Sequence, residues 1–174
     1  MSTIIAKLKP ARKAELASKG PMGAALKPTV SFAGVVSAQI RGPEFGRPAS
    51  ELSPGELIDA IRLGLPVEEL DVLQNSLGMP MDKLTPRLGM SKATLHRRKA
   101  RGRLGPAESD RVVRYARLMG KAVEVMEGME PARRWLSSPQ FGLGGAVPLD
   151  YAETEVGARE VEDLLGRIEY GVYS

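Results

Sequence analysis

The chain has 174 residues, which is enough for one domain of ordinary size or two small ones. Hydrophobic residues make up 43% of the sequence and aromatic residues 5%, so we expect a core built mainly from Leu, Val, Met and Ala. The absence of cysteine excludes disulfides and thiolate metal sites and fits a reducing cytoplasm. There is no apolar run of signal-peptide length, and the longest apolar stretch, around Thr29–Ile40, is too short to span a bilayer. We therefore expect a soluble, cytoplasmic protein without a membrane partner.

The net charge of +4 hides an uneven distribution along the chain. Residues 1–50 carry 8 cations and 2 anions, and residues 81–117 carry 11 and 3. Residues 51–80 carry 1 cation and 6 anions, and residues 118–174 carry 5 and 10. This asymmetry suggests two partners of different character, of which one is a polyanion.

Residues 1–50 show no convincing periodicity, and prolines and glycines interrupt them repeatedly. A short helix near Ala11–Ser18 is possible, and Val30–Ile40 can be a strand or a docking segment. We interpret residues 1–50 as a basic arm that is flexible or loosely docked. A basic arm that tracks phosphate groups is the alternative.

Two short helices are expected after residue 50. Ser53 and Glu56 form a capping box around Pro54, which opens a helix to about Leu63. A second helix over Pro66–Leu77 ends at Gly78. The residues expected to face inward are Leu57, Ile58 and Ile61 in the first helix and Leu70, Leu73 and Leu77 in the second.

Residues 81–103 match a helix–turn–helix template. Gly89 falls at the tight turn, and Ser91 is placed to cap the second helix. Pro86 lies inside the first helix, so that helix either starts late, near Thr85, or is kinked. The residues expected to pack the two helices together are Leu84, Leu88 and Leu95.

The second of these helices has the pattern of a recognition helix. With Leu95 inward, a repeat of about 3.6 residues per turn leaves Ala93, His96, Arg97, Ala100 and Arg101 outward. Small and cationic residues in this arrangement suit the major groove of DNA, although an ordinary helix with a solvated basic face is the alternative. We expect Lys92, His96 and Arg97 to face base edges and cations behind them to hold phosphates. The candidate DNA-binding residues are Ser91, Lys92, Thr94, His96, Arg97, Arg98, Lys99, Arg101 and Arg103.

A longer helix is predicted from Pro106 to about Glu127. Its apolar seam can form the protein core or a dimer interface, and we favour the core. A short helix over Pro131–Ser137 places Trp135 as a core anchor. Residues 139–148 are too rich in Gly and Pro for regular structure, and Gly144-Gly145 is expected to form a turn. The seam residues are Val112, Ala116, Met119, Val123 and Met126.

The last predicted helix covers Thr154–Ile168, with Val161, Leu164, Leu165 and Ile168 inward. The chain then ends in two tyrosines and a valine around a glycine, an unusual composition for a free terminus. Such residues are favoured where a surface docks into a partner, although they can also pack back on the protein's own bundle.

The sequence contains little that suggests catalysis. There is a single histidine, His96, on the basic helix, where contact with DNA or solvent is a simpler role than that of a catalytic base. No Ser/His/Asp grouping, metal-ligand spacing or P-loop occurs. We therefore expect no catalytic residue, no metal and no cofactor.

Several spaced motifs from Ser53 to Ser174 resemble the Xre/MbcA/ParS family of antitoxins, partners of RES-domain toxins. The resemblance implies an all-α protein, with a DNA-binding helix–turn–helix domain at 51–117 and a helical toxin-binding domain at 118–174. The motifs are Thr94-Leu95-His96-Arg97-Arg98, Gly102-Arg103-Leu104, Glu108-Ser109-Asp110-Arg111-Val112, Ala132-x-x-Trp135-Leu136-x-x-Pro139, Leu143-Gly144-Gly145-x-x-Pro148-Leu149, Thr154-Glu155-x-Gly157 and Val161-Glu162-x-Leu164-Leu165-x-Arg167-Ile168-x-Tyr170-Gly171.

The resemblance also implies a cognate RES toxin that consumes NAD and whose active site the C-terminal end of the antitoxin covers. It implies autorepression of the operon and a homodimer within a larger toxin–antitoxin complex. A stand-alone helix–turn–helix repressor is the alternative. The residues implied to bind the toxin are Trp135, Arg167, Ile168, Tyr170, Gly171, Val172, Tyr173 and Ser174.

Overall fold

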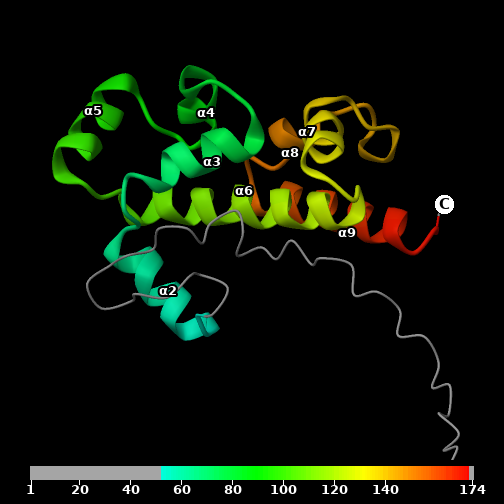
Figure 1. Cartoon of the computed structure of the whole chain (residues 1–174), viewed down its shortest axis with the longest axis horizontal. Coiled ribbons are helices and arrows are strands. Elements are labelled where there is room, and N and C mark those ends of the chain that lie inside the picture. Colours follow the sequence, from blue (N-terminus) through cyan, green and yellow to red (C-terminus); the bar gives the residue numbers. More distant parts are fainter. Residues whose placement is uncertain (1–51, 173–174) are drawn as a thin grey trace, which may run out of the picture.

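The computed structural model describes residues 52–172 (Figure 1). Within this range the chain is helical and forms no strand, and one isolated antiparallel bridge pairs Pro66 with Arg103. The expected all-α fold is therefore confirmed. The expectations for Ala11–Ser18 and Val30–Ile40 lie outside the described residues, as do Tyr173 and Ser174.

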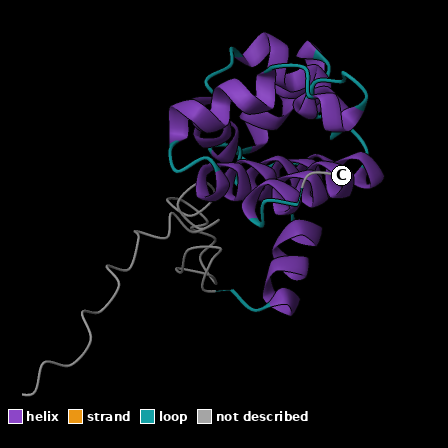
Figure 2. Cartoon of the chain, turned by 90° about the vertical axis from the view of Figure 1, so that its right-hand side faces the viewer, coloured by secondary structure: helices purple, strands orange, loops and turns teal. Residues whose placement is uncertain are grey.

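A long central helix, α6, organises the fold (Figure 1). Helices α3, α4 and α5 lie over its first half, α7 and α8 lie over its second half, and α9 packs along it. Helix α2 lies on the opposite side of α6 from α3–α5, and Figure 2 shows it projecting from the rest of the bundle. The elements are α2 (Pro54–Leu63), α3 (Glu69–Leu77), α4 (Met81–Arg87), α5 (Lys92–Arg101), α6 (Pro106–Val125), α7 (Met129–Ser137), the 3-10 helix η2 (Phe141–Leu143), α8 (Pro148–Tyr151) and α9 (Glu155–Glu169).

Helix α2 begins with the predicted capping box. The backbone N–H of Glu56 donates to Ser53 Oγ at 3.3 Å, and the N–H of Ser53 donates to Glu56 Oε2 at 2.7 Å. Leu57 and Ile61 pack against the core, but Ile58 is 48% exposed, so its predicted inward position is wrong. The reason is that α2 packs chiefly on α6 and buries only one narrow face.

Helix α3 begins at Glu69, later than the predicted Pro66, because Pro66 is engaged in the bridge to Arg103. The helix ends at Gly78, whose φ of +65° lies in the left-handed region that favours glycine. The predicted inward residues of this helix, Leu70, Leu73 and Leu77, are buried.

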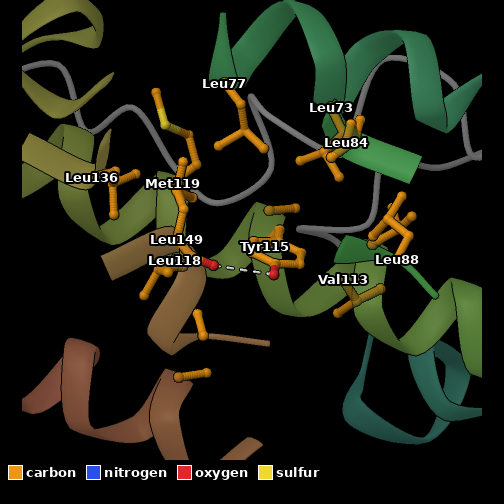
Figure 3. Close-up of a cluster of buried hydrophobic side chains, with 14 of the residues drawn as sticks. Leu73, Leu77, Leu84, Leu88, Val113, Tyr115, Leu118, Met119, Leu136 and Leu149 are labelled. Atoms are coloured by element: carbon orange, nitrogen blue, oxygen red, sulfur yellow. Dashed lines mark hydrogen bonds between the residues drawn. The ribbon is translucent and has the colours of Figure 1, made fainter. Parts of the chain in front are cut away.

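The core surrounds α6, as Figure 3 shows. Leu73 of α3, Leu84 of α4, Leu136 of α7 and Leu149 of α8 converge on this helix (Figure 3). The predicted seam lies inside the single chain, which confirms the core interpretation over a dimer interface. Its members Val112, Ala116, Met119 and Val123 are buried, and Met126 is partly buried against the core.

The C-terminal third departs from the prediction in its details. Helix α7 starts at Met129 rather than Pro131, and the Gly/Pro-rich segment that was expected to be irregular contains η2 and the start of α8. Gly144 and Gly145 form the expected turn, with φ of +65° and +86°. In α9, Val161 and Leu165 are buried and Leu164 is partly buried against the core. Ile168 is also only partly buried, and it lines a surface pocket together with Leu164.

Candidate functional site

The turn between α4 and α5 has helix–turn–helix geometry. Gly89 has a φ of +67°, and a Cβ at this position would lie 2.7 Å from Nη1 of Arg111. The backbone N–H of Thr94 donates to Ser91 Oγ at 3.1 Å, which is the predicted cap of α5. The expected packing residues Leu84 and Leu88 are buried, and Leu95 is partly buried against the core.

Pro86 lies in the last turn of α4, which begins at Met81 and not near Thr85. Proline removes only one backbone donor here, and the helix still closes with a bond from Leu88 N–H to the carbonyl of Leu84 at 3.2 Å. The hydroxyl of Thr85 donates to the carbonyl of Met81 at 3.0 Å. The first helix of the motif, α4, therefore remains helical up to Arg87, directly before the turn, despite Pro86.

Helix α5 presents an exposed basic face. All five positions that were expected to point outward are exposed, and Lys92 and Lys99 are exposed as well. Small side chains alternate with cations on this face, so a polyanion can approach the helix backbone closely. The outward positions are Ala93, His96, Arg97, Ala100 and Arg101.

Several arginines of the basic segment have partners inside the protein. Arg98 Nη2 lies 3.0 Å from Glu108 Oε1 of α6. Arg103 Nη1 donates to the carbonyl of Gly64 at 2.8 Å. Both candidate phosphate contacts therefore also hold parts of the fold together, and the charge of Arg98 is offset by Glu108.

A buried carboxyl group lies beneath this motif. Glu69, at the start of α3, is only 1% exposed, and its Oε1 has no hydrogen-bond partner among the described residues. Burial raises the pKa of Glu69 to about 7, with a further contribution from the negative charge of Glu68. Its ionisation state therefore changes near neutral pH.

An ion-pair network fastens α9 to α6. Arg117 Nε lies 2.6 Å from Glu162 Oε1, and Arg114 Nε lies 3.0 Å from Glu155 Oε2. Partial burial opposes ionisation of Glu155, but the hydrogen bond from Arg114 and the charge of Arg117 outweigh it. The pKa of Glu155 is lowered as a result.

Two further contacts join α8 to α6 and to the helix–turn–helix. The hydroxyl of Tyr115, which is fully buried, donates to the carbonyl of Leu149 at 3.2 Å (Figure 3). Burial raises the pKa of Tyr115 to about 12, so the hydroxyl remains a donor at neutral pH. Arg87 of α4 pairs with Asp150 of α8. The helix–turn–helix and the C-terminal helices thus share one core.

A pocket of about 510 Å³ opens at the far end of the molecule, between the η2 turn and the last two turns of α9. Three of its lining residues, Arg167, Ile168 and Val172, were implied by the resemblance to bind the toxin. Sequence reasoning missed the opposite wall, because a Gly/Pro-rich segment gives no periodic signal. The lining residues are Gln140, Phe141, Gly142, Leu164, Arg167, Ile168 and Val172.

The η2 turn holds Phe141 entirely in solvent, with 100% of its side chain exposed. Gln140 Nε2 donates to the carbonyl of Trp135 at 2.9 Å, and Leu143 is buried in the core. A Cβ at Gly142 would lie 2.6 Å from Cδ1 of Leu164, so the turn lies close to α9 and a larger residue here would require the Leu164 side chain to move. Phe141 is therefore exposed on a turn that is itself well bonded.

The other residues implied to bind a toxin divide into two groups. Tyr170 is 79% exposed and Val172 is 55% exposed beyond the end of α9, and Gly171 between them has a φ of +66°. Trp135 is only partly exposed and packs against the core, as expected for an anchor.

Among residues 52–172, no group of three or more His, Cys, Asp or Glu side chains could hold a metal ion. Within the same range, none of the helices has the length and apolar character that crossing a membrane requires.

Comparison with known families gives two adjoining matches. The family described as the antitoxin Xre-like helix-turn-helix domain matches residues 56–117, and the antitoxin Xre/MbcA/ParS C-terminal toxin-binding domain matches residues 121–171. A protein named Antitoxin Xre from Yersinia enterocolitica is 38% identical over 133 residues, which cover 75% of this chain and 88% of the relative.

The chain belongs to the Xre antitoxin family. A second Antitoxin Xre, from Photorhabdus laumondii, is 34% identical and covers 70% of this chain and 84% of its own length. A protein named Prs ADP-ribosylating antitoxin, from a Sphingobium species, is 27% identical with 70% and 83% coverage. This antitoxin thus carries a helix–turn–helix domain and a toxin-binding domain, and its family implies a regulatory, non-enzymatic role.

Proposed function

We propose that this antitoxin neutralises a RES-domain toxin that consumes NAD, and that its C-terminal end covers the toxin's active site. The observation that carries this proposal is the exposure of Tyr170 and Val172 at the very end of the toxin-binding domain. Large apolar side chains in water at a chain end are suited to burial in a partner. The word ADP-ribosylating in the name of the Sphingobium relative agrees with a partner whose chemistry involves NAD.

The described part of the tail, residues 170–172, lies outside the buried core. The helix α9 ends at Glu169, and its closing bonds run back into the helix, from the N–H of Tyr170 to the carbonyl of Gly166 at 3.1 Å and from the N–H of Val172 to the carbonyl of Arg167 at 2.9 Å. The core beneath is complete at Leu165. Removal of the tail therefore leaves the buried residues of α9 in place.

The test is co-purification with the product of the neighbouring reading frame, followed by an NAD-consumption assay. The wild-type chain is expected to suppress NAD loss, whereas a chain lacking residues 170–174 is expected to leave the toxin active at equal concentration. Tyr151→Ala is the matched control, because Tyr151 is an exposed tyrosine (42%) on α8. Full suppression by the truncated chain would contradict the occlusion mechanism.

We further propose that a dimer of this antitoxin represses its own operon in the cytoplasm through α5. The exposed cations of α5 support contact with operator DNA, and a dimer requires half-sites about 34–36 Å apart or a multiple of that distance. Footprinting of the promoter region tests this second role. Equal affinity for operator and random DNA would contradict it, and the absence of any toxin partner would favour a stand-alone repressor.

A further inference from the structure

We infer that the pocket beside Phe141 is the anchoring site for the toxin, and that it accepts an apolar side chain of the toxin bordered by a carboxylate. This inference rests on the proposed function and separates two tasks within it. The pocket provides binding affinity, whereas the tail after α9 provides inhibition. The two sets of residues meet at Val172, but Phe141 and Arg167 of the pocket lie outside the tail and can be changed without altering it.

The Phe141 side chain is fully exposed to solvent. Leaving a phenylalanine ring wholly in water forgoes the free energy that its burial would contribute. The turn that carries the ring is held on both sides, by the hydrogen bond from Gln140 to the carbonyl of Trp135 and by the buried Leu143. Exposed aromatic residues on rigid supports are typical centres of binding energy in protein interfaces.

The exposed ring of Phe141 lies beside an apolar cavity. Phe141 projects at the rim, and Leu164, Ile168 and Val172 provide apolar walls in a space of about 510 Å³. A flat surface would bury less of a partner's apolar side chain than this cavity. A partner surface with one apolar side chain beside a shallow depression fits both features.

The pocket carries a positive charge at Arg167. Arg167 lines the pocket and forms no ion pair within residues 52–172, whereas Arg114, Arg117 and Arg159 each pair with Glu155. A guanidinium at the edge of an apolar pocket is best satisfied by a carboxylate of the occupant. This complementarity favours a protein side chain pair over a purely apolar ligand.

The pocket is continuous with the tail after α9. Both walls of the pocket lie in the segment matched by the toxin-binding domain, residues 121–171, and Val172 belongs to the pocket and to the tail. A toxin anchored here has residues 170–172 directly beside it. The pocket thus places the tail at the toxin surface.

The test is a titration of purified toxin against the full-length antitoxin and two variants. Phe141→Ala is expected to raise the dissociation constant of the complex by roughly 30-fold or more, as for a central interface residue. Arg167→Gln is expected to weaken it several-fold, with a smaller loss at high salt. Val156→Ala is the matched control. Val156 is 74% exposed on the first turn of α9, the helix that carries Arg167, and lies about 18 Å from Ile168 along the helix axis.

Two further measurements keep the inference falsifiable. Phe141→Ala is expected to leave the thermal midpoint of the free antitoxin unchanged, because the ring touches little of its own chain. At saturating antitoxin this variant is expected to suppress NAD loss fully, whereas the chain lacking residues 170–174 does not. Toxin binding by Phe141→Ala with the affinity of the wild type would overturn the inference while leaving the proposed function intact.

The remaining outcomes are equally decisive. Dissociation of a self-associated form by Phe141→Ala, with no change in toxin affinity, would assign the pocket to a second copy of this chain. Absence of any complex between toxin and wild-type antitoxin would overturn the proposed function and the anchoring site together.

Discussion

Arg98 of α5 and Glu108 of α6 are joined by two hydrogen bonds to one oxygen. Nε and Nη2 of Arg98 lie 3.3 Å and 3.0 Å from Glu108 Oε1, and the other carboxylate oxygen accepts from the backbone N–H of Gly105. The two side chains are 20% and 10% exposed. Glu108 therefore closes the start of α6 and fixes the recognition helix to it at the same time.

Replacing Arg98 with Ala is expected to lower the free energy of unfolding by about 2 kcal/mol, because a mostly buried carboxylate loses its charged partner. Urea unfolding of the free protein measures this loss. Replacement of the exposed Lys99 is the matched control and is expected to change stability by less than about 0.5 kcal/mol. A reduction of the salt dependence of DNA binding without loss of stability would contradict the internal role of Arg98.

Replacing Arg97 with Ala is expected to have the opposite profile. This exposed side chain takes no part in the contacts that hold α5, so stability is expected to remain unchanged. Specific operator binding is expected to weaken by about 1–3 kcal/mol if the guanidinium makes a bidentate base contact. Electrophoretic or fluorescence titration measures the change, with Arg134→Ala, an exposed arginine of α7, as control. Equal losses on operator and random DNA would indicate a phosphate contact instead.

The carboxyl group of Glu69 is expected to make stability pH-dependent. Its pKa is raised from 4.5 to about 7 in the folded state, so the folded protein holds a proton there that the unfolded chain has already released. Stability therefore falls as the pH rises from about 4.5 through about 7, by up to about 3 kcal/mol from this group.

Glu69→Gln is expected to remove that loss. The variant should be more stable than the wild type at pH 8 and close to it at pH 5, measured by urea unfolding at both values. Asp71→Asn, an exposed carboxylate in the same first turn, is the control. A wild-type advantage at pH 8 would show that ionised Glu69 has a stabilising partner.

Replacing Tyr115 with Phe is expected to cost about 1–2 kcal/mol of stability, because the carbonyl of Leu149 loses a buried donor at 3.2 Å. The bond joins α6 to α8, so hydrogen exchange should increase in α8 more than in α5. Tyr151→Phe removes an exposed hydroxyl and is the control. Equal stability of the two variants would indicate that the Tyr115 hydroxyl contributes nothing to the contact.

The local structure of the first half could be predicted from the sequence. Helix starts and ends are marked by Ser53, Gly78, Gly89 and Ser91. Each acts through a hydrogen bond or a backbone dihedral angle that involves only a few neighbouring residues. The apolar repeat of α6 likewise follows from the helix period alone. These features are local, so the residues that carry them are adjacent in the sequence.

The roles of the charges and the surface of the C-terminal end depended on tertiary structure. The sequence of residues 81–117 counts Arg98, Arg103 and Arg117 as cations available to a polyanion, but each has a partner in another part of the fold. Arg98 pairs with Glu108 of the next helix, and the partners of Arg103 and Arg117 lie 39 and 45 residues away. The pocket joins Phe141 to Ile168, which are separated by α8 and most of α9. Periodicity and composition decide which residues form helices, whereas packing around α6 decides which cations remain free and where an apolar side chain is left in water.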